Sequence, residues 1–235
     1  MKICIAQTIS EKGEVSKNIK NHITLIENAI DAAADLIVFP ELSITGYVPT
    51  LATLLATTKD DTPFDHFQEK SNQNNITIGI GVPLISNNGI TISMLFFQPN
   101  KERLIYSKQL LHTDELPYFV KGNEYLNLSI KNKTIAFGIC YETLQTSHFK
   151  NSVNDKTDVY IASVAKSQNG IDKAQLHFPK MAKEYSIPIL LSNAIGLCDN
   201  FIAVGQSAVW DKNGALVEQI DTKNQGIIIF EIDPI

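Results

Sequence analysis

The chain has 235 residues, of which 44% are hydrophobic, and it carries a formal net charge of −5. A chain of this length can bury a full hydrophobic core, and a single domain over residues 1–235 is expected. The basic residues are scattered singly or in pairs, which argues against a nucleic-acid-binding protein. No segment reaches the roughly 18 apolar residues of a membrane span, and the start lacks a signal-peptide pattern, so a soluble, cytoplasmic protein is expected.

Apolar periodicity predicts alternating helices and strands. Helices are expected over residues 17–34, 61–74, 143–153 and 172–185. Strands are expected over residues 2–6, 35–39, 76–82, 90–97, 103–108, 134–139, 159–164, 187–193, 201–209, 215–219 and 226–232. Asn87-Asn88-Gly89 and the run 211–214 predict tight turns. Strands that are apolar on both faces indicate an α/β fold with helix-covered sheets, although periodicity does not decide between one sheet and two.

Cys140 lies at the end of a predicted buried strand. The preceding segment, Thr134–Ile139, is apolar along nearly its whole length, and strands commonly present side chains to a site where they end. A thiol in that position can attack a carbonyl carbon if its neighbours favour the thiolate and hold the developing oxyanion. Taken alone, a cysteine in this position is more often a buried structural cysteine than a nucleophile.

Two charged residues also follow predicted strands. Glu41 comes after the apolar run 36–39, where burial can raise the pKa of a carboxyl group towards that of a useful base. Lys108 ends a later strand, on the same face as Leu104 and Tyr106. Considered separately, a surface carboxylate and an edge-strand lysine are the commoner interpretations of such residues.

Together, the three segments resemble the nitrilase, or carbon-nitrogen hydrolase, superfamily. Phe39–Tyr47 is similar to its glutamate motif, Tyr106–Lys108 to its lysine motif and Gly138–Glu142 to its cysteine motif, and they occur in the family's order. The resemblance extends from the first residue to about the last strand. It implies the family's four-layer α-β-β-α sandwich, in which two sheets pack face to face.

The resemblance also implies a role for each motif. Glu41 is implied as general base, Cys140 as nucleophile and Lys108 as the residue that stabilises the tetrahedral intermediate, while Glu115 resembles an additional active-site glutamate. Amide hydrolysis needs a nucleophile, oxyanion stabilisation and a proton for the leaving amine, which these groups can supply. The backbone N–H of Tyr141 can assist Lys108, and water activated by Glu41 can cleave the thioester. No metal or organic cofactor is needed.

The remaining cysteines and histidines indicate no other site. Cys4, Cys140 and Cys198 lack the spacing of a disulfide framework or a zinc site, and no histidine pair has metal-binding spacing. Cys4 is expected in the core, and Cys198 at a pocket rim or on the surface. A papain-like thiol hydrolase would need His112 as its base, which has less support than Glu41.

Six further residues are candidates for the substrate pocket. They are Tyr47, Tyr118, Tyr141, Ser163, Lys166 and Asn193. Tyr47 and Tyr118 can form an aromatic wall or simply pack. Lys166, after the next strand, can bind a substrate carboxylate or be a solvated strand-end charge. Asn193 can support the site from a third strand, or bond to its own backbone in a turn.

The substrate remains open because the sequence departs from the common family pattern. The cysteine motif continues Tyr-Glu-Thr-Leu-Gln over residues 141–145, where many members have an aspartate or arginine and then a proline and glutamate. Glu142 itself is interpreted as the start of the next helix. A small amide ranks before a carbamoyl compound and a nitrile, and amine transfer is a further option. A non-catalytic binding or assembly protein is the alternative from another class, and a homodimer is the expected assembly.

Overall fold

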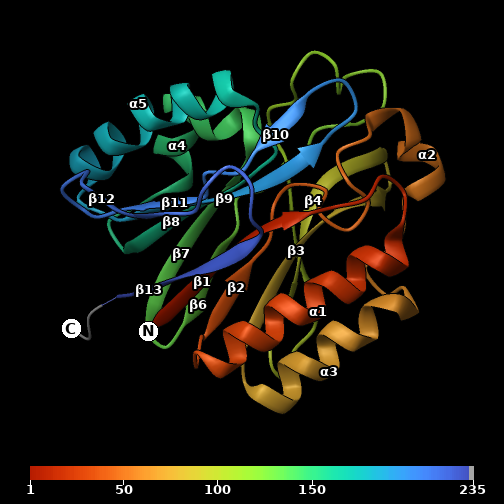
Figure 1. The fold of residues 1–235 in the computed structure, drawn as a ribbon, viewed down its shortest axis with the longest axis horizontal. Coiled ribbons are helices and arrows are strands. Elements are labelled where there is room, and N and C mark those ends of the chain that lie inside the picture. Colours follow the sequence, from red (N-terminus) through yellow and green to blue (C-terminus); the bar gives the residue numbers. More distant parts are fainter. Residues whose placement is uncertain (233–235) are drawn as a thin grey trace.

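The computed structural model describes residues 1–232. Strands occupy the middle of the molecule, with helices on two opposite sides (Figure 1). The helices are α1 (Val15–Asp31), α2 (Ala52–Leu55), α3 (Asp65–Asn74), α4 (Thr146–Ser152) and α5 (Gln168–Tyr185), with 3₁₀ turns η1 (Pro49–Leu51), η2 (Thr62–Phe64) and η3 (Cys140–Leu144). The strands are β1 (Lys2–Ile9), β2 (Leu36–Val38), β3 (Thr77–Ser86), β4 (Gly89–Phe97), β5 (Leu104–Ser107), β6 (Asn127–Ile130), β7 (Lys133–Ile139), β8 (Thr157–Val164), β9 (Ile189–Leu197), β10 (Ile202–Val204), β11 (Ala208–Trp210), β12 (Leu216–Gln219) and β13 (Gly226–Glu231).

Strand pairing runs in the order β5-β4-β3-β2-β1-β9-β8-β7-β6. β1, β2 and β3 are mutually parallel, as are β7, β8 and β9, and the two groups join through a short parallel pairing of β1 with β9. β4 is antiparallel to both β3 and β5, so β5 points in the same direction as β3. The carboxyl ends of β2, β5, β7 and β8 therefore share one edge, which is where sites form in sheets of this kind.

Alternating side chains on each strand build separate cores. Ile3 and Ile5 of β1 pack in a central core with residues of β7 and β8, such as Phe137 and Ile161. Cys4 and Ala6, which alternate with these residues along β1, face the opposite side and pack in the core under α1 and α3. A third core joins β7–β9 to α4 and α5. Helix, sheet, sheet and helix form four layers, which confirms the predicted α-β-β-α fold, with the two sheet halves connected as a half-barrel.

Most predicted elements are present with shifted ends. The predicted helix over 143–153 is instead two pieces, η3 and α4, which are separated by Gln145 in an extended conformation. The predicted strand over 201–209 is split into β10 and β11, both of which pair with β9. The split occurs at Gly205 and Gln206, which have positive φ angles. The buried Gln7 side chain lies at this break, where its Oε1 accepts from Ser207 N at 2.9 Å.

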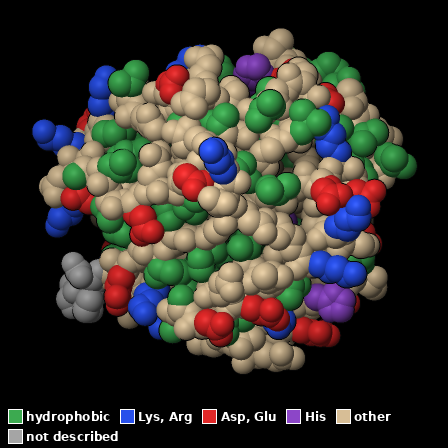
Figure 2. Space-filling model, in the orientation of Figure 1, with side chains coloured by type: hydrophobic (Ala, Val, Ile, Leu, Met, Phe, Trp, Pro, Cys, Tyr) green, Lys and Arg blue, Asp and Glu red, His purple; other side chains and the backbone are tan. Residues whose placement is uncertain are grey.

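The sequence patterns missed β6 and the short helices η1 and α2. β6 and β7 form a hairpin through Lys131 and Asn132, whose φ angles of 48° and 62° suit a tight turn. None of the helices in residues 1–232 is both long and apolar enough to cross a membrane. Charged side chains of both signs are interspersed on the face seen in Figure 2.

Gly81 on β3 allows the chain after β2 to pack closely against that strand. A Cβ atom at position 81 would lie 2.3 Å from Pro40 O and 2.4 Å from Leu42 N, both of which are backbone atoms. Ile44 N also donates to Gly81 O at 3.0 Å. The glycine therefore fixes where the segment that carries Glu41 can lie, because no side chain fits between the two backbones.

We expect Gly81→Ala to lower the free energy of unfolding by about 2–3 kcal/mol, because the new methyl group must displace backbone atoms. Urea denaturation measures this change. Gly226→Ala is the matched strand control, since its Cβ would meet only Ile220 Cδ1 at 3.9 Å, and it should change stability by less than about 0.5 kcal/mol. Equal stabilities of the two variants would contradict this account of Gly81.

Candidate active site

A buried lysine between two buried carboxylates lies at the shared edge of the strands. Lys108 Nζ is 2.7 Å from Glu41 Oε1 and 2.5 Å from Glu115 Oε1. The Lys108 and Glu115 residues are fully buried, and Glu41 is 2% exposed. Tyr47 OH donates to Glu115 Oε1 at 3.0 Å, and His112 N donates to Glu115 Oε2 at 2.7 Å. The cluster joins the predicted base, lysine and additional glutamate.

The backbone around Lys108 is fixed on both sides. Lys108 N donates to Ile92 O, and Gly122 N donates to Lys108 O, each at 2.8 Å. Gly122 lies so close to β5 that a Cβ there would be 2.2 Å from Ser107 O. The backbone of Lys108, just after β5, is therefore fixed by hydrogen bonds to β4 and to Gly122. These bonds limit where the ammonium group can lie.

The charges of this cluster affect one another strongly. Burial raises the pKa of Glu41 to about 7, Glu115 adds to the increase and Lys108 opposes it. Burial also disfavours the charge of Lys108, but the negative groups around it, Glu41 foremost, raise its pKa above the ordinary lysine value. Glu41 Oε2 has no hydrogen-bond partner among the residues described. Glu41 therefore has the pKa and the free oxygen of a general base.

Cys140 begins η3 with a left-handed backbone, at a φ angle of 49°. Such a conformation is unfavourable for a residue other than glycine, and it turns the thiol out of the strand direction. Gly138 lets the neighbouring backbone approach Tyr160, because a Cβ there would lie 2.1 Å from Tyr160 OH. The turn thus presents Cys140 at the end of β7, as a nucleophile requires.

The environment of Cys140 contains both signs of charge. The pKa of the Cys140 thiol is raised to about 11, chiefly by burial and then by Glu41, while Lys166 and Lys108 act to lower it. Cys140 Sγ is 3.5 Å from Ala165 O and 3.9 Å from Lys166 Nζ. The resting group is accordingly a thiol that needs a base, and Glu41, whose charge acts on the thiol, is suited to that role.

Two polar side chains, those of Ser163 and His22, hold the segment that carries Glu41. Ser163 Oγ donates to Phe39 O at 2.8 Å. His22 Nδ1 lies 2.7 Å from Asn18 O, so its Nε2 accepts from Ser43 Oγ at 2.9 Å. Burial lowers the pKa of His22 to about 4, which keeps the ring neutral. The hydroxyl of Ser163, a predicted pocket residue, is directed to this backbone.

Asn193 holds Lys166 in the same way. Its Oδ1 accepts from Lys166 N at 2.8 Å, and its Nδ2 donates to Lys166 O at 3.2 Å and to Gly205 O at 2.6 Å. The break between β10 and β11 supplies the Gly205 carbonyl, so this irregularity serves the site directly. Lys166 is 6% exposed, which contradicts its interpretation as a solvated strand-end charge. The Asn193 side chain therefore bonds to the segments that contain Lys166 and Gly205.

Glu142 connects the lysine and cysteine segments and was missed as a site residue. Its Oε1 accepts from Tyr106 OH at 2.5 Å and from Ile139 N at 2.8 Å. Its Oε2 accepts from Gln109 N at 2.7 Å and Leu110 N at 3.1 Å. The carboxylate is fully buried, so these bonds are the interactions that compensate its burial. Its position two residues after the nucleophile was the only available sequence signal.

The remaining predicted residues lie around this centre. Tyr47 is 6% exposed, whereas Tyr118 and Tyr141 are both 39% exposed. His112 is bonded to Asp114 through Nδ1 and its ring lies 5.4 Å from that of Tyr141. No hydrogen bond joins His112 to Cys140 among the described residues, so the geometry lacks a papain-like pair.

Two cysteine expectations differ in outcome. Cys4 lies in the core beneath α1, as expected. Cys198 is 5% exposed and packs in the central core, so of its two predicted locations the surface was wrong, and the rim of the pocket stays a prediction. Its backbone is held by Cys198 N donating to Phe201 O at 2.9 Å. The polar neighbours of Cys198 in sequence therefore did not indicate exposure of the thiol itself.

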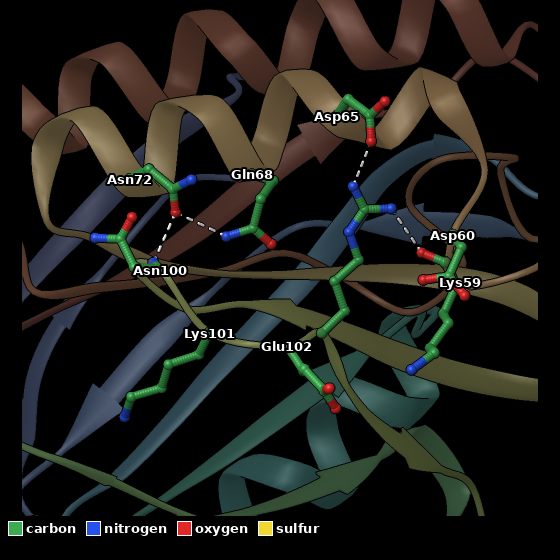
Figure 3. Close-up of a pocket in the computed structure, with 9 residues that line it drawn as sticks. Lys59, Asp60, Asp65, Gln68, Asn72, Asn100, Lys101 and Glu102 are labelled. Carbon is green, nitrogen blue, oxygen red and sulfur yellow. Dashed lines mark hydrogen bonds and ion pairs between the residues drawn. The ribbon is translucent and has the colours of Figure 1, made fainter.

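The surface hollow drawn in Figure 3 lies elsewhere, beside α3 and the turn before β5. Arg103 spans it, donating to Lys59 O at 2.7 Å and to Asp65 Oδ1 at 2.5 Å. It has no cysteine in its lining, and these bonds give Arg103 a structural role. Across residues 1–232, no three histidine, cysteine or carboxylate side chains are arranged to hold a metal ion.

Comparison with known families gives a match to the carbon-nitrogen hydrolase model over residues 2–234. Glutamine-dependent NAD(+) synthetases from Thermotoga maritima and Aquifex aeolicus are 25% and 22% identical to the chain over 99% of its length. The chain spans only 42% of the length of each of these relatives.

Solved structures with a similar fold include the NitN amidase from Neterenkonia sp. AN1, with a TM-score of 0.89, 18% identity and coverage of 99% of this chain and 93% of that one. A cysteine-to-alanine mutant of the amidase from Nesterenkonia sp. AN1, in complex with butyramide, has a TM-score of 0.88 and 18% identity, and covers 99% and 90% of the two chains. These likenesses agree with the fold described above.

We expect Glu142→Gln to lower the free energy of unfolding by about 3 kcal/mol, because one terminal atom becomes a donor that faces N–H or O–H groups. Urea denaturation with a fluorescence readout measures the loss. Glu69→Gln is the control, since the Glu69 side chain is 66% exposed, and it should stay within about 0.5 kcal/mol of the parent. A Glu142→Gln variant as stable as the parent would show that the four bonds are not essential.

Proposed function

The chain belongs to the carbon-nitrogen hydrolase family, and on that premise we propose that it hydrolyses a small amide through a thioester on Cys140. The observation that carries this proposal is the meeting of Cys140 with the buried Glu41–Lys108 pair. Glu41 keeps one oxygen without a partner, and its pKa of about 7 suits transfer of a proton in either direction. This combination of nucleophile, base and cation serves acyl transfer.

In the first half of the reaction, Glu41 takes the thiol proton as Cys140 Sγ attacks the amide carbon. Negative charge moves to the carbonyl oxygen, where Lys108 and the backbone N–H of Tyr141 stabilise it. Collapse of the tetrahedral intermediate breaks the carbon–nitrogen bond, and Glu41 passes its proton to the leaving nitrogen. The products of this half are ammonia or an amine and a thioester on Cys140.

In the second half, Glu41 removes a proton from water, which attacks the thioester. The same oxyanion groups act again, and the proton returns to the Cys140 sulfur as the acid leaves. Glu115 keeps Lys108 charged and oriented through its 2.5 Å contact, and the hydrogen bond from Tyr47 fixes Glu115 in turn. Neither half needs a metal or an organic cofactor.

We propose that some of the predicted pocket residues contact the substrate and that others act indirectly. Tyr118 and Tyr141 are partly exposed beside the site and form the open wall, with Tyr47 behind them. Ser163 and Asn193 act through the backbone that they hold, namely the Glu41 segment and Lys166. Lys166 is the remaining polar group at the nucleophile. The tyrosines are suited to a small substrate with an apolar part.

The comparisons support an amide substrate and suggest which amides to test. The amidase with a similar fold was solved with butyramide, and the curated relatives are named as glutamine-dependent. Butyramide and glutamine are therefore the first substrates, followed by carbamoyl compounds and nitriles. Because the chain spans less than half of each synthetase, NAD(+) synthesis itself is not part of the proposal.

We also propose a homodimer in the cytoplasm. Exposed apolar side chains suitable for an interface occur on neighbouring strands of the C-terminal part, at Leu197 and Ile202. Light scattering after size exclusion measures the assembly, and a monomeric mass at micromolar concentration would contradict it. Cell fractionation measures the location.

We expect Cys140→Ala and Glu41→Gln each to lower kcat by at least about a thousandfold, because each removes a group that forms or breaks a bond. Ammonia release from butyramide and glutamine measures turnover, and intact-mass spectrometry detects the acyl-enzyme. Cys198→Ala is the control, since its buried thiol has no step in the mechanism.

Retained turnover in folded Cys140→Ala protein would overturn the mechanism. Retained turnover in Cys140→Ala together with its loss in a His112→Ala variant would favour another thiol or base arrangement. If the parent hydrolyses none of the amides, carbamoyl compounds or nitriles yet binds one of them, a binding or assembly role replaces the proposal.

We expect kcat/KM to fall as the pH drops through about 7, because Glu41 must be ionised to accept the thiol proton. The raised pKa keeps the Glu41 carboxyl group protonated, and therefore inactive as a base, up to a higher pH than an ordinary glutamate, so kcat/KM falls as the pH is lowered. A profile for butyramide between pH 3.5 and 9 measures this limb. An acid limb at the ordinary carboxyl pKa, about 4.3, would contradict the assignment of Glu41.

A further inference from the structure

Lys166 is a buried cation beside the nucleophile that forms no ion pair with a carboxylate in the part of the chain the structure describes. Its Nζ donates to Cys140 O at 3.2 Å and lies 3.9 Å from Cys140 Sγ. Buried lysines are rare unless they are paired. The nucleophile's sulfur is the one group within reach whose charge changes during the proposed reaction.

The surroundings fix Lys166 in this position. Asn193 holds the backbone N–H and carbonyl of Lys166 at 2.8 and 3.2 Å, and Val204 N donates to the same carbonyl at 3.2 Å. The first turn of α5 passes close to the lysine stem, and a Cβ at Gly170 would lie 3.0 Å from Lys166 Cβ. Gly170 therefore leaves the space that the stem occupies. A lysine held at both backbone and stem is positioned and not free to leave for solvent.

We propose that Lys166 is a catalytic residue that pairs with the Cys140 thiolate, an inference that rests on the proposed function. When the thiol proton moves to Glu41 Oε2, negative charge moves from the carboxylate to sulfur. Lys108 keeps Glu115 as its partner at 2.5 Å, and Lys166 supplies the partner that the sulfur needs. The transfer then leaves each lysine beside one negative group.

The proton and electron balance closes without another reactant. The thiolate electron pair forms the carbon–sulfur bond, the carbonyl π pair moves to oxygen, and the proton held by Glu41 leaves with nitrogen. Lys166 transfers no proton at any step. Its charge lowers the free energy of the thiolate, and that benefit ends when the sulfur becomes a neutral thioester.

Other titratable groups face this pair from several elements. Glu41 and Glu115 oppose formation of the thiolate, whereas Lys108 favours it, as Lys166 does. Tyr47 and Cys198 stay neutral because burial raises the pKa of each, that of Cys198 to about 12. On α5, burial and the charges of Lys166 and Lys180 lower the pKa of His177, which is therefore uncharged at neutral pH.

The test measures the rate at which fluoroacetamide or iodoacetamide alkylates Cys140 at pH values between 5 and 10. Peptide mass spectrometry quantifies the modified cysteine. We expect Lys166→Met to slow alkylation at least about tenfold at pH 7 and to shift the rate profile to higher pH by about one unit. Lys166→Arg keeps the charge and should recover part of the rate. kcat for butyramide should fall with the alkylation rate, while KM changes little.

Lys133→Met is the matched control. Lys133 is also a buried lysine, 8% exposed, but its Nζ pairs with Asp158 at 3.0 Å at the opposite end of β7. Its loss should leave the alkylation profile of Cys140 unchanged. Thermal melts of all variants check that the fold is retained, and a second substitution, Lys166→Gln, replaces Lys166→Met if the latter does not fold.

The outcomes separate this inference from the proposed function. An unchanged profile in Lys166→Met, in protein whose Cys140→Ala variant is inactive, overturns the role of Lys166 alone. Retained turnover in Cys140→Ala overturns the proposed function itself. A Lys166→Met variant that alkylates normally but has a raised KM only for amides carrying a carboxylate overturns the thiolate role and assigns Lys166 to substrate binding.

Discussion

The structure depends on one buried electrostatic constraint, the position of Lys108 between Glu41 and Glu115. Three charges without solvent are costly unless each finds a partner at hydrogen-bond distance. One lysine cannot balance two carboxylates, so burial, with the charge of Glu115 added to it, raises the pKa of Glu41 to about 7 and makes Glu41 a proton acceptor near neutral pH. Both oxygens of Glu115 are occupied by hydrogen bonds, from Tyr47 and Lys108 at Oε1 and from the His112 backbone at Oε2, whereas Glu41 Oε2 has no partner among the described residues. The asymmetry of hydrogen bonding thus selects which glutamate is the base.

The strand directions explain why distant residues meet there. β2, β5, β7 and β8 run in one direction through the two halves of the sheet, and each has a charged or nucleophilic residue just beyond its end. Such groups are buried at the edge of a sheet only if loops cover that edge. Here the loops do so by packing their backbone closely against the strands. Gly81 and Gly122 allow that packing, since a single Cβ at either position would separate backbone segments that now touch.

Much of the fold and the reactive groups could be predicted from the sequence because both leave local signals. Apolar strands and a periodic helix are local, and so are residues that directly follow a strand. The roles of Glu142, His22 and Asn193 are not local, since each side chain forms a hydrogen bond to a group in another segment. The hairpin at Lys131 and Asn132 was missed because its turn lacks glycine. The burial of Lys166 and Cys198 likewise comes from packing that no short window contains.

A second lysine makes the charge arrangement symmetrical. With both glutamates ionised and both lysines protonated, the four groups sum to zero, and moving a proton from Cys140 to Glu41 leaves that sum unchanged. Reaction therefore requires only that negative charge move from one oxygen to the sulfur, a short displacement between two fixed cations. A neutral amide enters such a site without adding charge, whereas an anionic substrate would have to draw Lys166 away from sulfur. The same pairing that activates the thiol thus favours neutral amides.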